Sequence, residues 1–254
     1  MERVAAGLPV VTGPQWTGVN YFCTTRAGGV GIAPHDTLNL GRRAGDDPDT
    51  VAENRRRVRA AVPAEPLWLR QVHGSEVVDA DQAGLPDEPA ADASVTSHPG
   101  RVLAVMVADC LPVVIADAAG TVLGAAHAGW RGLSGGVLEH TLAAMRAKAP
   151  QAAGWRAWVG PGIGPEAFEV GQDVLDAFEA HDAAARRYFV ERPGKPGKWL
   201  ADLAGLADFR LRRAGVQEVS LSRMCTVTEA DRFFSYRRDG ETGRMALLAW
   251  LGTV

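Results

Sequence analysis

Cysteine, lysine and long hydrophobic runs are scarce in this 254-residue sequence, and the scarcity of cysteine and of long hydrophobic runs each excludes a class of protein. The three cysteines, an odd number spread widely, argue against a disulfide framework and fit a reducing cytoplasm. The most apolar stretch, residues 102–118, carries Asp109 and Pro112 at its centre and is too short to span a bilayer. Since the first residues lack the apolar segment of a signal peptide, we expect a soluble, cytoplasmic protein with no membrane partner.

The charge balance excludes a broad basic surface. The formal net charge of −3 provides no positive field for nucleic acid or an anionic membrane. Only three of the 27 basic residues are lysines, which together with the many alanines and glycines indicates GC-rich coding and not a function. Because the length permits a substantial core, and no internal repeat or long linker is visible, we predict a single domain over residues 1–254.

Strand-like runs outnumber helical patterns, and the two kinds are interspersed, which favours an α+β (mixed α/β) fold with a mixed sheet covered by helices. The short segment 118–120 predicts an antiparallel hairpin between the runs on either side of it. The predicted helices are residues 49–61, 133–149, 173–181 and 202–214. The predicted strands are residues 19–24, 67–72, 76–80, 102–108, 113–117, 121–126, 155–159, 187–190, 216–221 and 245–251.

Three candidate metal ligands, His73, Cys110 and His127, each lie just past the end of a predicted strand. Strands of one sheet often end at a common edge, so these side chains can converge although they are far apart in sequence. Two imidazoles and a thiolate suit Zn²⁺, and three protein ligands leave a fourth position open for water or substrate. This stoichiometry is that of a catalytic zinc, and it makes an enzyme the leading hypothesis.

Simpler interpretations of the same residues exist. A cysteine in an apolar run is more often a buried small hydrophobe, and a single histidine is usually a hydrogen-bonded side chain. No C-x-x-C or H-x-x-x-H pair supports the site locally, although a glycine or proline follows closely after each candidate ligand. Cys23 and Cys225 have no ligand types beside them in sequence, and we interpret both as structural.

The densest motif is His-Ala-Gly-Trp-Arg-Gly-Leu-Ser-Gly-Gly, residues 127–136. It precedes a predicted helix, whose free N–H groups attract anions, and Arg131 could add a bidentate contact to phosphate. A strand-to-helix turn with a solvated arginine is the alternative. The motif is no Walker loop, because no Gly-Lys-Ser/Thr follows. Segment 160–165 does not match Gly-x-Gly-x-x-Gly, so a dinucleotide site is not supported.

Several stretches, taken together and in order, resemble the laccase-domain family, whose members are variously called multicopper polyphenol oxidase-like proteins, purine nucleoside phosphorylases and peptidoglycan editing factors. They are Thr24-Thr-Arg-Ala-Gly-Gly-Val30, Leu38-Asn-Leu-Gly41 with Gly45-Asp-Asp47, Gln71-Val-His-Gly74, Ala108-Asp-Cys-Leu-Pro112, His127-Ala-Gly-Trp-Arg-Gly132, Gly160-Pro-Gly-Ile-Gly-Pro165 with Phe168-Glu-Val-Gly171, and Cys225-Thr226 with Phe233-Phe-Ser-Tyr-Arg-Arg238. They extend over nearly the whole chain, so the resemblance is highly specific.

The resemblance implies a single domain in which sheets are sandwiched between helices, similar to cysteine-hydrolase-like toxin domains. It implies a zinc ion held by the residues matching His73, Cys110 and His127. It also implies phosphorolysis of adenosine, inosine and methylthioadenosine to the base and ribose 1-phosphate, plus adenosine deamination. Many members have histidine where this chain has Arg43. An arginine cannot act as general acid or base near neutral pH, so at this position only an anion-holding role is expected.

The expected partners are therefore purine nucleosides and phosphate. Deamination suits a hydroxide on a zinc ion held by His73, Cys110 and His127, attacking the purine carbon that bears the amine. Phosphorolysis needs phosphate beneath the anomeric carbon, for which Arg131 is the first candidate and Arg43 the second. The zinc or Asp109 would act on the purine side.

Three rival hypotheses remain open. One is a metal-free cysteine hydrolase that cleaves an amide in a peptidoglycan precursor, with Cys110 as nucleophile and His127 or His73 as base. Another is copper oxidation, since blue-copper sites also use two histidines and a cysteine, but these usually add an axial methionine and occur in oxidising compartments. The nearest methionine, Met106, lies in the same predicted strand as Cys110 and implies no axial geometry. The third is a non-catalytic partner of the cell-wall machinery.

Overall fold

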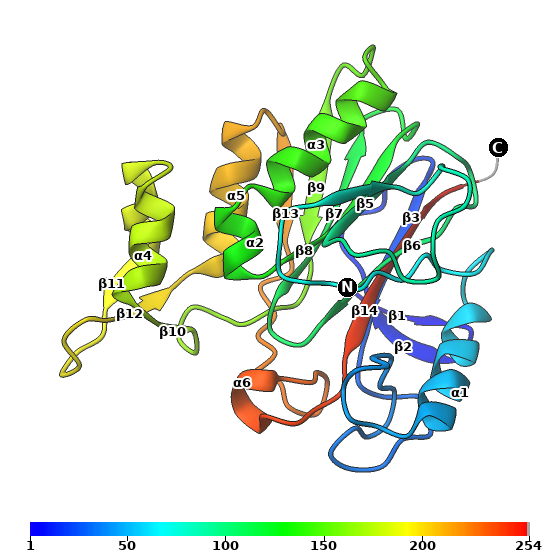
Figure 1. The fold of residues 1–254 in the computed structure, drawn as a ribbon, viewed down its shortest axis with the longest axis horizontal. Helices are drawn as coiled ribbons and strands as arrows, with labels where there is room; N and C mark the ends of the chain where they lie inside the picture. The colour runs from blue at the N-terminus through cyan, green and yellow to red at the C-terminus, as the bar shows by residue number, and fades with distance from the viewer. Residues whose placement is uncertain (253–254) are drawn as a thin grey trace.

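Two β-sheets packed face to face form the centre of the protein in the computed structural model, which describes residues 1–252 (Figure 1). The five-stranded sheet contains, in spatial order, β1 (Glu2–Ala5), β2 (Leu8–Val11), β3 (Val19–Thr24), β14 (Met245–Leu251) and β6 (Leu103–Val107). The six-stranded sheet contains β13 (Glu218–Leu221), β9 (Trp155–Val159), β7 (Leu111–Asp117), β8 (Leu123–Ala128), β5 (Ala93–Thr96) and β4 (Val77–Asp79). Both pairs at the ends of the six-stranded sheet are parallel, and its inner pairs are antiparallel.

Strand β7 is almost purely apolar because both of its faces are buried. Successive side chains of a strand point to opposite faces, and both faces of this one are covered. Val113 and Ile115 pack into the core under the helices, whereas Val114 and Ala116 pack between the two sheets. The antiparallel pairing of β7 with β8 confirms the hairpin predicted at residues 118–120.

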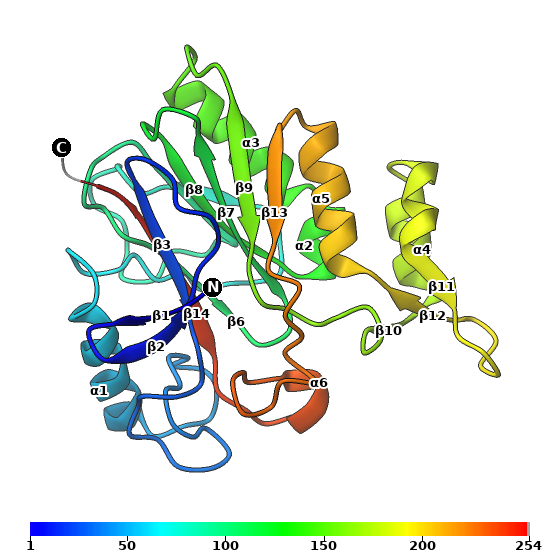
Figure 2. The same cartoon turned by 180° about the vertical axis from the view of Figure 1, so that it is seen from behind.

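Helices cover the outer face of each sheet (Figures 1 and 2). Helices α3 (Val137–Lys148) and α5 (Leu203–Arg213) pack on the six-stranded sheet, and α1 (Pro48–Arg59) packs on the five-stranded sheet. Asp47 caps α1 by accepting a hydrogen bond from the Thr50 N–H, and Asp202 caps α5 in the same way through the Gly205 N–H. The result is the α+β arrangement of sheets between helices that the sequence predicts.

Smaller elements flank these layers. Strands β10 (Glu169–Gly171), β12 (Lys198–Ala201) and β11 (Phe189–Glu191) form a third sheet, which lies with α4 (Gln172–Glu179) and a 3₁₀ helix (Ala183–Tyr188) to one side of α5 (Figure 1). Two short helices, α2 (Trp130–Ser134) and α6 (Tyr236–Asp239), complete the fold. Within the described residues, no helix has the length and apolar character needed to cross a membrane.

Three sequence predictions need correction. Residues 67–72 form only isolated bridges, at Leu67 and Arg70, because the backbone N–H groups that follow bond to a carboxylate and not to a neighbouring strand. The helix predicted at residues 133–149 is divided into α2 and α3, since Gly136 has a φ of 92°, which ends one helix before the next begins. Residues 187 and 188 belong to the 3₁₀ helix and not to a strand. Strands β1, β2, β5, β10 and β12 were not expected.

Candidate metal centre

The structure brings His73, Cys110 and His127 together, with their potential ligand atoms all within 4.8 Å of one another. His127 lies inside β8, opposite Pro112 of β7, and Cys110 immediately precedes β7. His73 comes from the irregular segment after residue 70 and has a left-handed φ of 61°. The three side chains therefore converge as the sequence predicts. Cys110 follows the end of β6 as expected, whereas His127 lies within β8 and His73 lies in a loop.

The space between these side chains fits a metal ion. At the usual zinc distances of about 2.0 Å to nitrogen and 2.3 Å to sulfur, tetrahedral ligands lie about 3.3–3.6 Å apart, a modest contraction of the group. A Cβ atom on Gly129 would lie 2.8 Å from Cys110 Sγ and 3.3 Å from His73 Cδ2. Glycine at this position leaves free the space that a side chain would fill. The donor set and this vacant space together indicate a metal site.

Asp92 organises two of the three candidate ligands. Its fully buried carboxylate accepts the backbone N–H groups of Val72, His73 and Gly74 at 3.1, 2.9 and 2.8 Å, and its Oδ1 lies 2.8 Å from Nδ1 of His127. Burial alone would raise the pKa of this carboxyl, but the His127 ring and the N–H donors lower it, so the group stays ionised. Because Nδ1 of His127 is held by Asp92, Nε2 is left to face a metal.

Sequence reasoning missed Asp92. It stands among alanines just before β5, and a carboxylate in so apolar a run is a sign of a buried, fully hydrogen-bonded group. No local spacing connects it with His73 or His127, because the contact depends on how β5 and β8 pair.

Cys110 and His127 form a coupled pair. Burial alone would raise the pKa of the Cys110 thiol, but His127 and His73 lower it to about 6. Burial alone would lower the pKa of His127, whereas the Cys110 thiolate and Asp92 raise it. Cys110 is therefore a thiolate at neutral pH, which is the form that binds a metal ion or attacks an electrophile.

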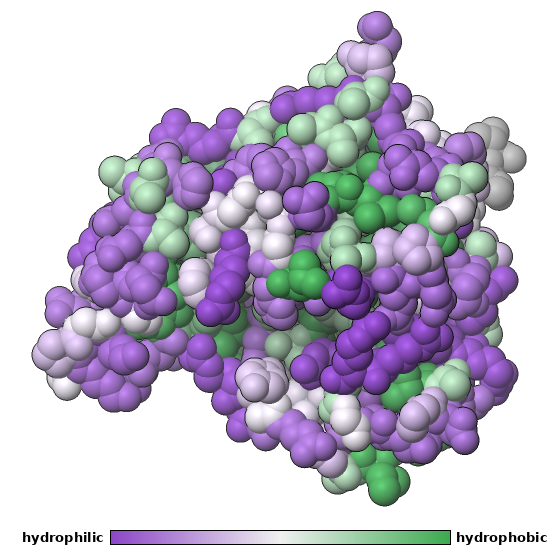
Figure 3. Space-filling model, viewed as in Figure 1, coloured by the Kyte–Doolittle hydropathy of each residue, from purple (hydrophilic) through white to green (hydrophobic). Residues whose placement is uncertain are grey.

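A cavity of about 490 Å³ lies over this group. Hydrophilic side chains surround a recess on this face of the molecule (Figure 3). The cavity is lined by apolar and aromatic residues and by five arginines; the apolar and aromatic residues include Trp130, Ile163, Phe168 and Tyr236, and the arginines are Arg42, Arg43, Arg131, Arg237 and Arg244. It thus combines a surface for a flat apolar group with strong positive charge.

The two predicted phosphate-binding residues both line the cavity but differ in their partners. Arg43 donates to Glu88 at 2.6 Å, so a carboxylate already balances its charge. The Arg131 guanidinium lies over the Trp130 ring, 4.4 Å from its centroid, and has no hydrogen-bonded partner within residues 1–252. Since α2 is only five residues long, the guanidinium and not a helix terminus provides the positive charge there.

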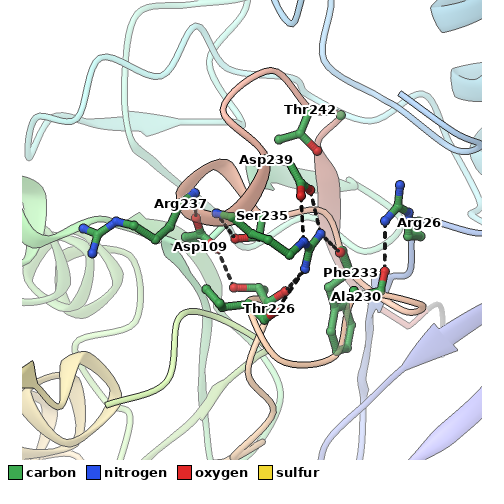
Figure 4. A network of polar contacts seen from close by, with 12 residues as sticks. Arg26, Asp109, Thr226, Ala230, Phe233, Ser235, Arg237, Asp239 and Thr242 are labelled. Atoms are coloured by element: carbon green, nitrogen blue, oxygen red, sulfur yellow. Dashed lines mark hydrogen bonds and ion pairs between the residues drawn. The ribbon is translucent and has the colours of Figure 1, made fainter. Parts of the chain in front are cut away.

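Asp109, which precedes Cys110 in the same turn, is hydrogen-bonded to Thr226 and Arg237 (Figure 4). Its carboxylate accepts the Thr226 hydroxyl and the Arg237 backbone N–H, both at 2.6 Å, and its own carbonyl accepts the Ile163 N–H at 2.8 Å. Both carboxylate oxygens are therefore engaged in holding other segments of the chain. Of the two remaining cysteines, Cys23 is buried between the sheets, and the sulfur of Cys225 accepts the Gly164 N–H at 3.3 Å.

Residues 20–252 match the family model described as multi-copper polyphenol oxidoreductase laccase. The chain is 49% identical over 247 residues to "Purine nucleoside phosphorylase YfiH" of Escherichia coli, covering 94% of this chain and 97% of that protein. It is 46% identical over 241 residues to "Purine nucleoside phosphorylase PA4543" of Pseudomonas aeruginosa, with 94% and 97% covered.

Solved structures with the same fold include Neisseria meningitidis protein NMB0706, with a TM-score of 0.88 and 46% identity over 96% of this chain and 98% of that one. The Bacillus licheniformis hypothetical protein YfiH has a TM-score of 0.88 and 28% identity, covering 98% of both chains. The residues matched by the family model include the metal centre and the cavity lining from Gly41 to Arg244.

Substituting Gly129 with alanine tests whether the vacant space holds a metal. The backbone there, with φ −70° and ψ 163°, suits any residue, so the added Cβ acts only through its 2.8 Å approach to Cys110 Sγ. We expect Gly129→Ala to lower metal affinity by at least roughly tenfold, as for other disturbed metal sites, with little change in thermal stability. Elemental analysis and thermal melting measure both. Gly154→Ala, whose Cβ would meet Ala118 at an ordinary 3.5 Å, is the control. Full metal content in Gly129→Ala would refute the proposed position.

Replacing Asp92 with asparagine should weaken metal binding by roughly ten- to a hundredfold, because His127 loses the carboxylate that orients it. Competition with a chelator of known affinity measures the change. Asp117→Asn is the matched control, since Asp117 is also buried and accepts two backbone N–H groups, from Thr121 and Val122, away from the cavity. Both variants should be less stable, but only Asp92→Asn should bind metal more weakly. Equal metal affinity in the two would show that Asp92 serves stability alone.

Proposed function

The chain belongs to the multi-copper polyphenol oxidoreductase laccase family, and we propose that it is a zinc-dependent purine nucleoside phosphorylase. The observation that carries this proposal is the cavity itself. There the His73, Cys110 and His127 group and an aromatic wall lie together with Arg131, whose guanidinium has no hydrogen-bonded partner within residues 1–252. The names of relatives that match almost the whole chain support the same activity.

In the proposed reaction, a phosphate oxygen forms a bond to the anomeric carbon of the ribose while the bond from that carbon to the purine nitrogen breaks. The bonding electrons leave with the base, which then takes up a proton. Arg131 binds the phosphate through its guanidinium, since two parallel N–H groups match two phosphate oxygens. Trp130 and Phe168 provide the surface against which the purine packs.

Zinc would be held by His73, Cys110 and His127 and would supply a Lewis acid beside the substrate. The residues around it keep these ligands in place. Asp92 orients His127, and Asp109 fixes the turn that carries Cys110 through its bonds to Thr226 and Arg237. With both oxygens engaged, Asp109 is better placed to position Cys110 than to exchange a proton with the purine.

Adenosine, inosine and methylthioadenosine are the proposed nucleosides, with deamination of adenosine as an accompanying activity in a cytoplasmic protein. Arg43, if it contributes, acts as an anion-holding residue and must first exchange its contact with Glu88. We propose that residues 1–254 function as one domain, because the cavity is lined by residues from Gly41 to Arg244.

A second candidate is a cysteine hydrolase, favoured by one observation. Cys110, His127 and Asp92 stand in the order of a nucleophile, a base and the carboxylate that orients the base. The zinc phosphorylase and the cysteine hydrolase differ in how accessible the Cys110 thiol is to an alkylating reagent. Zinc should protect Cys110 from alkylation if the centre is a metal site, and a chelator should remove that protection. Copper chemistry gains less support, because the Met106 sulfur is in contact with Arg55 Nη2, at 3.8 Å.

Phosphate dependence tests the proposed reaction directly. With metal-replete protein and adenosine, free adenine and ribose 1-phosphate should form only when phosphate is present, because phosphate is the nucleophile. Inosine formation by deamination should not require phosphate. Product analysis by chromatography, with and without phosphate, distinguishes the two activities. An equal yield of adenine without phosphate would point to a hydrolase and reject phosphorolysis.

Arg131→Ala should raise the KM for phosphate by roughly ten- to a hundredfold, the consequence of losing a charge-assisted contact of about 1.5–3 kcal/mol. Arg131→Lys should recover the loss only partly, because an ammonium lacks the two-pronged geometry. Arg186→Ala is the control, since Arg186 also stacks on a tryptophan, Trp199, but lies outside the cavity. If Arg131→Ala reduces deamination equally while the metal stays bound, the phosphate role is wrong.

A further inference from the structure

Arg244 is, with Arg131 and Arg237, one of three arginines in the cavity that have no carboxylate partner within residues 1–252, and it is the only one of the three that is not exposed. It directly precedes β14 and is half-buried. In the part of the chain that the structure describes, its guanidinium donates only through Nη1, to the carbonyl oxygens of Thr242 and Gly243 at 2.7 and 3.0 Å. Nε and Nη2 have no acceptor within residues 1–252. By contrast, Arg42 and Arg43 each form an ion pair with an acid, Asp87 or Glu88.

The environment of Arg244 makes this unpaired charge costly. Burial lowers the pKa of the Arg244 guanidinium, and the charges of Cys110, Asp109 and Tyr236 oppose this effect. An arginine nevertheless keeps its proton in proteins, so the cost of burial must be met by a counter-ion. Asp109 already accepts two hydrogen bonds of its own from Thr226 and Arg237. When a Cys110 thiolate binds a divalent metal, the metal neutralises its negative charge. The thiolate then no longer serves as the counter-ion of Arg244.

The surrounding residues hold the Arg244 side chain in place. A Cβ on Gly41 would lie 2.8 Å from Arg244 Cγ, so a glycine at this position leaves room for the Arg244 side chain. Asn39 Oδ1 accepts the backbone N–H groups of both Gly41 and Arg244, each at 2.9 Å. This single amide joins the loop that carries Arg42 and Arg43 to the segment that carries Arg244. The position of the guanidinium is thus fixed before any ligand arrives.

We infer that Arg244 is the inner anion-binding residue of the cavity, and that it binds inorganic phosphate through Nε and Nη2 while Arg131 contacts phosphate from the more exposed rim. The pair Nε and Nη2 is one edge of the guanidinium and matches two oxygens of a phosphate. The inference rests on the proposed function, in which phosphate is a substrate. It adds a residue that Gly-rich motifs and family resemblance do not indicate.

Direct binding of inorganic phosphate to metal-loaded protein tests this inference. Equilibrium dialysis with radiolabelled phosphate would compare wild type with Arg244→Gln and Arg244→Lys. We expect the dissociation constant to rise roughly ten- to a hundredfold in Arg244→Gln and less in Arg244→Lys, which keeps the charge without the planar edge. Arg210→Gln is the control, because Arg210 is another poorly exposed arginine, paired with Glu139 outside the cavity. It should bind phosphate as wild type does.

The KM for adenosine and the metal content distinguish a specific loss of phosphate binding from a general structural defect. Adenosine KM and metal content should change little in Arg244→Gln, whereas a general structural defect would alter all three quantities. Wild-type phosphate affinity in Arg244→Gln overturns the inference. If that variant fails to fold, Arg244→Lys decides, and unchanged phosphate affinity in it overturns the inference. Wild-type protein that binds phosphate through Arg244 but forms no ribose 1-phosphate would refute phosphorolysis and leave the binding assignment intact.

Discussion

The hydrogen bonds of the Asp92 carboxylate are the constraint on which the candidate metal centre depends. One buried group accepts three consecutive backbone N–H groups, from residues 72–74, and orients the ring of His127. Within the described residues, the segment that carries His73 pairs with no strand at that point, so these partly buried N–H groups would otherwise have no protein acceptor. Asp92 therefore replaces a strand neighbour. It also places a loop histidine beside a histidine and a cysteine that belong to the β7–β8 pair.

Some arginines of the cavity are paired with carboxylates, so only the others remain free to bind an anion. Glu88 pairs with Arg43 and with Arg55 of α1, so the loop before α1 is neutralised and anchored at once. Within residues 1–252, Arg131, Arg237 and Arg244 lack such partners, and Arg244 is the least exposed of the three. In the proposed function, the guanidiniums of Arg131 and Arg244 bind the anion. Arg43 is held by Glu88 and anchors the loop before α1.

Much of the fold follows from local patterns, but the contacts that build the site do not. Strands β3, β9 and β14 occupy the predicted residues because each has an apolar run with clear ends. The ligand set could be proposed because histidine and cysteine are few and stand beside turns. The strand predicted at residues 67–72 is absent, since a distant side chain and not an adjacent strand takes its hydrogen bonds. Asp92 and Arg244 could not be identified, because their partners lie far away in sequence, as Asn39 does from Arg244.

X-ray absorption at the metal edge of protein purified without added metal would show whether His73, Cys110 and His127 hold a zinc ion. We expect an equimolar zinc ion whose first shell contains one sulfur at about 2.3 Å and nitrogen or oxygen neighbours at about 2.0–2.1 Å. The sulfur contribution should disappear in Cys110→Ser, while Cys225→Ser, altered outside the metal cavity, should leave the spectrum unchanged. A first shell without sulfur, a copper edge, or fully active wild-type protein that contains no metal would contradict the account.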